Sequence, residues 1–225
     1  MRAAAKPRRR IWPWILGAIL AISATIILVS ILNGTWGSSL PTATPTPSTP
    51  SSEVPDDVEP TGCLGGSTRD ADMVLEAQAS APQTANGAVE VAAAFVRWLN
   101  RYPYPTSSDI QKVETSGISV DAPTQDVAAF FAGSPNLSGG LVPDGVEYSL
   151  STLPGVYNIE SSSQKDVTVS VGTALVVDGA LSPTLKGSIT VHVTWEDQVW
   201  KFVSSEGTRT TEDLYAIGKP FTAGC

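Results

Sequence analysis

The chain has 225 residues, a formal net charge of −8 at pH 7, two cysteines and one histidine. Its charge is unevenly distributed: five of the 14 basic residues precede residue 11, whereas all 22 acidic residues follow it. The acidic portion repels phosphate backbones and anionic lipid headgroups, because proteins attract these through lysine and arginine. The composition therefore argues against direct nucleic-acid binding by that portion.

An uncharged apolar run of 22 residues, 11–32, follows directly after a basic tail, residues 1–10. At about 1.5 Å per residue, a helix of this length crosses the roughly 30 Å hydrocarbon core of a bilayer. Trp12 and Trp14 stand where indole rings favour the headgroup interface, and the basic tail places the N-terminus in the cytoplasm. We therefore expect a single-pass protein of the cell membrane with an extracellular C-terminal domain. A cleaved signal is the alternative, although its apolar region is normally shorter, about 7 to 15 residues.

Residues 33–62 are rich in proline, serine and threonine. Such a composition buries too little apolar surface to offset its chain entropy, and proline favours extended polyproline II structure. We predict a linker that holds the folded domain, residues 63–225, away from the membrane.

Cys63 and Cys225 lie at the two ends of the predicted domain. Disulfides persist in the oxidising compartments that exported domains enter, and domain termini often lie close together. In the chain-entropy model, a bridge across so long a loop stabilises the fold by about 5 kcal/mol. We predict a disulfide between them, with free thiols and intermolecular pairing as the alternatives. Neither cysteine has a neighbouring histidine or a CxxC partner, so we expect no metal site or redox catalysis.

Helical patterns occupy the first half of the domain. They predict helices at residues 71–80, 87–102, 108–114 and 123–132. In the second, apolar side chains recur every three or four residues and so share one face, which we expect to enter the core. Asn86 is its expected N-cap.

Strand patterns follow residue 145. Segments rich in β-branched and aromatic residues lie at 146–150, 156–159, 167–177, 185–195 and 199–204. In the fourth, buried-type and polar residues alternate, as in an antiparallel strand with one buried face, and residues 195–200 indicate a tight hairpin. The order predicts an α+β fold with helices packed on one face of a curved antiparallel sheet.

Few residues are candidates for chemistry. His192 shares a strand face with Thr190 and Thr194, which is typical of an ordinary polar strand residue, and the carboxylates are scattered in turns without metal-ligand spacing. We therefore expect no catalytic residue, cofactor or metal, and an enzyme is the last of our hypotheses. The residues considered for a cavity or binding surface are His192, Trp98, Trp195, Trp200 and Tyr157, and the tryptophans are equally expected in the core.

The succession of helices and strands, and above all the hairpin VHVTWEDQVWKF, resembles the nuclear-transport-factor-2-like, cystatin-like cone. The tail, apolar run, spacer and domain together are similar to proteins of actinobacterial mobile elements. The similarity includes GCLGG at residues 62–66, Ala81-Pro82, the stretch FVRW at residues 95–98 and the terminal Cys225.

By architecture, those proteins resemble the bitopic scaffold subunits of conjugative type IV secretion machines, which oligomerise and dock other components without catalysis. The resemblance implies a non-enzymatic envelope scaffold with protein partners or a homo-oligomeric state, in a DNA-transfer apparatus. The linker of this chain is longer than in those scaffold subunits, which weakens the expectation that the exported domain packs close to the membrane. An exported module that binds cell-wall glycan or a small apolar molecule is the alternative.

Overall fold

The computed structural model describes residues 57–206 and 209–225. The predicted basic tail and membrane span, with most of the predicted linker, lie outside these residues. Within the described ranges, no helix has the length and apolar character needed to cross a bilayer.

Within residues 57–206, four helices precede the main strands: α2 (Ala71–Ser80), α3 (Ala85–Leu99), α4 (Ser107–Ser116) and α5 (Val127–Gly133). Each begins after an Asp or Thr whose side-chain oxygen accepts a hydrogen bond from a backbone amide of the first turn. The prediction of Asn86 as a cap is wrong, because Thr84 caps α3 by accepting from the Gly87 amide at 3.0 Å. The helix also ends earlier than predicted, since Arg101 and Tyr102 pair with the sheet.

All neighbouring named strands of the sheet pair antiparallel, in the order β1-β2-β3-β4-β5. Its strands are β1 (Arg101–Tyr102), β2 (Tyr148–Ser162), β3 (Asp166–Val177), β4 (Ala180–Glu196) and β5 (Val199–Glu206), and β6 (Lys219–Pro220) pairs with β2. Two predicted strands, 146–150 and 156–159, are halves of β2, joined through a register shift between Ser151 and Val156. Pro154 lies in this irregularity, where the lack of an amide hydrogen costs no ladder bond.

The hairpin between β4 and β5 confirms the prediction for residues 195–200. Asp197 and Gln198 form its two-residue turn with φ values of 53° and 67°, and Glu196 pairs with Val199. Positive φ at both central residues is the conformation of a type I′ turn, whose twist matches that of antiparallel strands.

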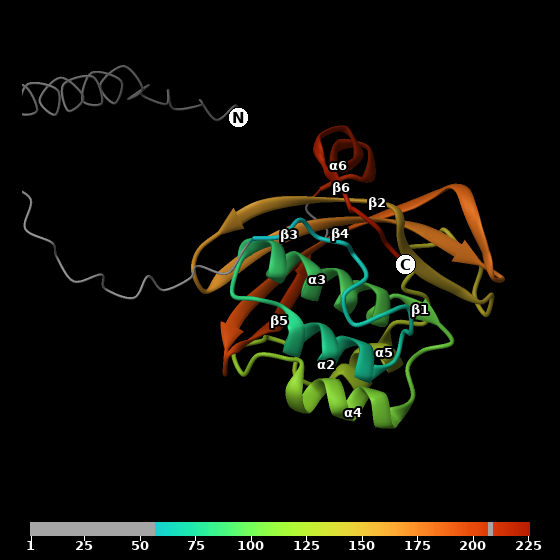
Figure 1. Cartoon of the computed structure of the whole chain (residues 1–225). Helices are drawn as coiled ribbons and strands as arrows, with labels where there is room; N and C mark the ends of the chain where they lie inside the picture. The colour runs from blue at the N-terminus through green and yellow to red at the C-terminus, as the bar shows by residue number, and fades with distance from the viewer. Residues whose placement is uncertain (1–56, 207–208) are drawn as a thin grey trace, which may run out of the picture. The chain divides into compact units, whose positions relative to one another are not determined.

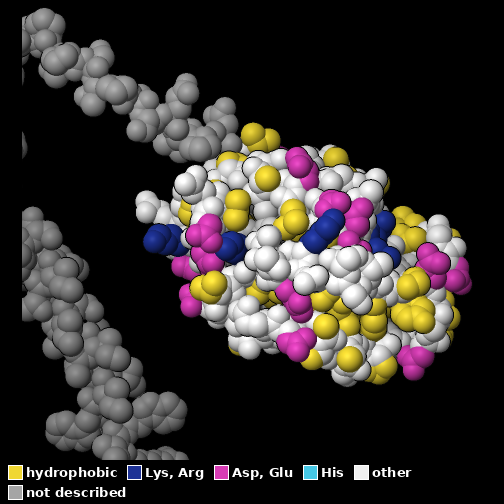
Figure 2. Space-filling view, turned by 90° about the horizontal axis from the view of Figure 1, so that it is seen from below, with side chains coloured by type: hydrophobic (Ala, Val, Ile, Leu, Met, Phe, Trp, Pro, Cys, Tyr) yellow, Lys and Arg dark blue, Asp and Glu magenta, His cyan; other side chains and the backbone are white. Residues whose placement is uncertain are grey.

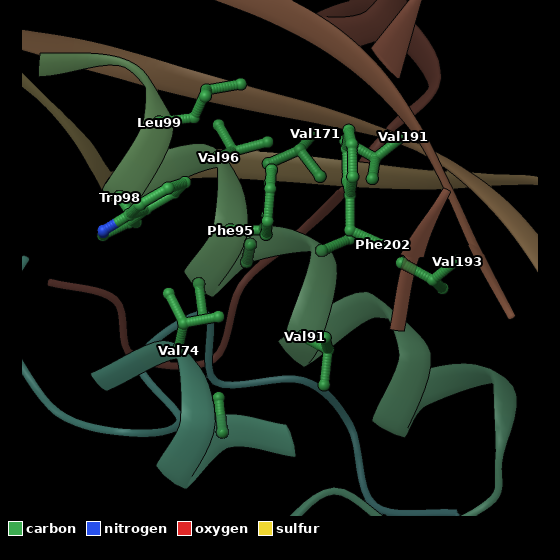
Figure 3. Close-up of a cluster of buried hydrophobic side chains, with 14 of the residues drawn as sticks. Val74, Val91, Phe95, Val96, Trp98, Leu99, Val171, Val191, Val193 and Phe202 are labelled. Atoms are coloured by element: carbon green, nitrogen blue, oxygen red, sulfur yellow. The ribbon is translucent and has the colours of Figure 1, made fainter. Parts of the chain in front are cut away.

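The curved sheet separates two unequal layers, as Figure 1 shows: α2 to α5 lie on one side and α6 (Thr211–Ile217) on the other. The core lies between α3 and the sheet, where the rings of Phe95 and Phe202 stack with centroids 3.9 Å apart (Figure 3). Val191 and Val193 of β4 are fully buried on this side. The α+β fold with helices on a curved antiparallel sheet is therefore confirmed, and α6 and β6 are additions that the sequence did not suggest.

Candidate functional site

The two ends of the domain are covalently joined. Cys63 and Cys225 form a disulfide with Cα atoms 5.4 Å apart, which confirms the predicted pairing. Thr152 of β2 connects the same two segments: its amide donates to the Cys225 carbonyl at 3.0 Å and its hydroxyl to the Gly62 carbonyl at 2.8 Å. Within the described residues, Gly62, Cys63 and Cys225 therefore meet at one place on β2.

Two buried charged side chains of α3, Glu90 and Arg97, hold the GCLGG segment at residues 62–66. One oxygen of Glu90 accepts from the hydroxyl of Thr61 at 2.7 Å, and the other accepts from the Gly62 amide at 3.1 Å. Arg97 donates to the carbonyls of Gly62 and Gly66 at 3.2 and 2.6 Å. Burial lowers the pKa of Arg97 to about 10, so the guanidinium stays charged at neutral pH. In this fold the motif is an anchoring element of the domain.

The aromatic residues selected from the sequence lie mostly inside the protein. Trp98, Trp200 and Tyr157 are 0, 1 and 3 % exposed. Trp200 donates its indole N–H to the Pro82 carbonyl at 2.8 Å, and Trp195 packs against it with centroids 5.3 Å apart. Such packed side chains stabilise the fold. Trp98, Trp195, Trp200 and Tyr157 line none of the three surface hollows of the domain.

His192 lines an open hollow of about 310 Å³ on the sheet face opposite to Val191 and Val193. Its Nε2 lies 3.4 Å from a carboxylate oxygen of Asp166, and the two side chains are 34 and 56 % exposed. Glu160, also in the lining, receives two hydrogen bonds from Arg209, which hold the pKa of its carboxyl at about 2. A carboxylate with so low a pKa is a weak base near neutral pH. Across the described residues, no group of three His, Cys, Asp or Glu side chains is placed to hold a metal.

A second hollow, of about 210 Å³, lies beside the outer edge of β5, and we call it the β5-edge groove. It is lined by Phe95, Leu99, Pro123, Thr124, Val127, Phe130 and residues 202–206. Its base consists of apolar side chains from α3, α5 and β5. Glu206 is the one charged residue in its lining, but Glu206 pairs with Thr190 and also lines the His192 hollow, so its side chain lies on the other sheet face. The groove therefore has an apolar floor.

The backbone of β5 is paired on its outer side at Phe202. Phe202 donates to the Gly117 carbonyl at 3.0 Å and accepts from the Ser119 amide at 2.8 Å, which forms a short parallel bridge. Beyond this point, within the described part of the chain, residues 203–206 make no backbone hydrogen bond to any segment other than β4. The groove thus lies along an open stretch of sheet edge.

The third hollow, of about 380 Å³, lies where β4 extends past β5. Its apolar lining comes from the segment after α5, from β2 and from β3, and includes Leu137, Leu141, Leu150 and Leu175. Lys186 and Asn100 add polar groups. This hollow adjoins the β5-edge groove, because Leu99 lines one and Asn100 the other.

On the helical face, seen in Figure 2, hydrophobic side chains gather among acidic ones. The groove residues of α5 were not candidates from the sequence, because nothing in the pattern around Val127 and Phe130 shows that they flank an open strand edge. The one signal available was that residues 117–133 contain no lysine or arginine. Comparisons of the chain with protein-family models, curated proteins and solved structures find no match.

Proposed function

We propose that this chain is a membrane-anchored, non-enzymatic interaction protein of the cell envelope, whose exported domain docks other envelope proteins. The disulfide between Cys63 and Cys225 carries the proposal, because such bonds form and persist outside the reducing cytoplasm. The apolar run of residues 11–32, preceded by a basic tail, supplies the means of attachment. An acidic exported domain on an anchor is suited to binding other proteins.

The open features of the fold support a docking role. The β5-edge groove offers an apolar floor and unpaired backbone, and the neighbouring hollow extends this surface along β4. Apolar concave sites with a few polar groups are the usual form of binding sites in proteins.

We also propose a cone of the nuclear-transport-factor-2-like class and a place in a conjugative DNA-transfer apparatus. The support is the curved antiparallel sheet covered by helices, together with the resemblance at residues 62–66 and in the hairpin at residues 195–200.

The membrane part of the proposal is tested by topology. A reporter enzyme that is active only outside the cytoplasm, fused after Cys225, is expected to be active, and the mature protein is expected to keep its N-terminal tail. A mature N-terminus beyond residue 35, or activity of a cytoplasm-only reporter, would overturn the anchored reading. The scaffold part is tested by the size and composition of detergent-extracted complexes, which we expect to contain further envelope proteins or several copies of the chain.

An exported ligand-binding module is the second candidate, and the third hollow favours it. Four leucines line a space of about 380 Å³, within the range of small-molecule sites. Native mass spectrometry of the purified chain distinguishes the candidates. A monomer that retains a small apolar molecule, and loses it when Leu141 is replaced by Glu, would favour the ligand-binding module.

A further inference from the structure

We propose that the β5-edge groove binds an extended segment of a partner protein, which adds to the sheet as a strand beside β5. The segment carries one apolar side chain that enters the groove and lysine or arginine close to it. This inference rests on the proposed function only in that the domain binds a protein partner.

The backbone of residues 203–206 is the first support. The bridge at Phe202 shows that the outer side of β5 already accepts a neighbouring chain, but the segment of residues 117–119 pairs with it at that point alone. Exposed sheet edges are normally blunted by lysine, proline or a covering element. The sequence of residues 203–206 is Val-Ser-Ser-Glu, which contains neither lysine nor proline. An extended peptide would supply the missing main-chain partners, as in strand-addition complexes.

The second support is the shape of the space next to this edge. In a strand, successive side chains point to opposite faces, so a peptide beside β5 directs alternate side chains toward the helices. Those side chains would meet Phe95, Leu99, Val127 and Phe130. A volume of about 210 Å³ suits one aliphatic or aromatic side chain and gives the peptide its position along the edge.

The third support is charge. Asp121 and Asp126 are exposed on the segment that forms the outer wall of the groove. Glu206 lies at the end of β5 with its side chain on the His192 face, where the other alternate side chains of an added strand would point. Residues 117–133 carry no balancing lysine or arginine. Complementary charge selects partners and speeds their association, so a basic segment is favoured over an acidic one.

The test uses the full chain in detergent micelles and a blocked peptide of sequence KVTLTVK. On binding, amide hydrogen exchange at residues 203–206 is expected to slow by about tenfold, while the amides of β3 remain unchanged. Two control peptides isolate the causes: EVTLTVE reverses the charge, and KVTLTVK methylated on every internal backbone nitrogen cannot pair with a strand through either edge. Both are expected to bind at least about tenfold more weakly.

Two surface substitutions with matched controls locate the site. Thr124→Trp fills the groove from its exposed wall and is expected to weaken KVTLTVK binding by about tenfold. Val120→Trp, at a residue 78 % exposed and outside the lining, is expected to leave binding unchanged. Glu206→Lys is expected to shift the preference toward EVTLTVE, and Glu147→Lys, the same charge change on another exposed residue, is expected not to.

Three results would overturn the inference: no protection at residues 203–206, equal binding of the methylated peptide, or no effect of Thr124→Trp. Self-association of the chain that Thr124→Trp abolishes would make a second copy the occupant and would also overturn it. Any of these results, alongside intact membrane topology and co-purifying proteins, rejects the groove as the docking site while leaving the proposed function standing.

Discussion

The two outer edges of the sheet differ in how far other segments cover them. Along β2, three segments contribute cover: β1 pairs with residues 148–149, the C-terminal Cys225 with Thr152, and β6 with residues 156–157. Along β5, within the described residues, the cover is the bridge at Phe202. Proteins normally protect sheet edges against unwanted pairing. The contrast indicates that stabilising contacts are concentrated at the β2 edge, while the described part of the β5 edge stays largely unpaired.

The largest effect is expected when the covalent closure of the β2 edge is removed. Replacing both Cys63 and Cys225 by Ser should lower the free energy of unfolding by about 2–5 kcal/mol, because the unfolded chain regains the entropy of a long open loop. Denaturant unfolding of the full chain in micelles measures this change. An unchanged midpoint would show that the hydrogen bonds of Thr152 and Glu90 suffice to hold this edge.

A smaller effect is expected for Glu90→Gln, at a side chain that is 7 % exposed. The glutamine side chain has one oxygen and one NH₂ group where Glu90 has two oxygens, so one acceptor becomes a donor that faces the amides of residues 61–64. Because those amides then lose a partner, the free energy of unfolding should fall by about 1–3 kcal/mol. Glu76→Gln, at an exposed position of α2, is the control and should have little effect. Because Glu90 and the disulfide hold the same segment, their combined loss should be non-additive. Simple additivity would contradict the idea of one shared anchor.

A pH effect is expected to be smaller still. Hydrogen bonds from Arg209 keep the pKa of the Glu160 carboxyl at about 2, below its ordinary value of 4.5. A depressed folded-state pKa stabilises the protein above pH 4.5, and this contribution is lost as the pH falls toward 2. Both side chains are partly exposed, so we expect less than about 1 kcal/mol. Arg209→Gln should reduce the slope of stability against pH between 2 and 4.5, and an unchanged slope would contradict the assignment.

The smallest effect on stability is expected at the open edge. Ser205→Lys should change the free energy of unfolding by no more than about 0.5 kcal/mol, because Ser205 is exposed and, among the described residues, has no backbone hydrogen bond to a segment other than β4. The same substitution should weaken binding of KVTLTVK, since it adds a positive charge and blunts the edge. A large loss of stability would mean that the β5 edge contributes to the structural framework as much as the β2 edge does.

Local patterns predicted much of the fold. The helix at residues 71–80, the strand at residues 167–177 and the hairpin at residues 195–200 follow from period and turn chemistry, and the structure contains all three. The continuous β2 was not predictable, because Leu153, Pro154 and Gly155 give a turn signal that pairing with β3 overrides. Helix α6 has seven residues, too few for a clear periodic pattern. Its position depends on the buried side chain of Leu214, which packs over Gly172 of β3.

The candidate site was less accessible to sequence reasoning. A glutamate and an arginine seven residues apart on α3 give no sign that both are buried around a glycine-rich segment. The openness of β5 is a property of the whole sheet and depends on where residues 117–119 leave it. His192 could be placed on the polar face by alternation alone, because neighbouring strand residues point to opposite sides.

The shared position of the two chain ends on β2 has a mechanical consequence. If residues 1–56 act as a tether, a pull on the domain enters at the segment bonded to Glu90 and joined covalently to Cys225. A partner held along β5 would bear the opposing force at the far side of the sheet. Because the disulfide ties this segment to Cys225, tension would not peel a terminus away from the fold. If the domain links an anchor to a partner, the covalent loop would keep the fold closed under load.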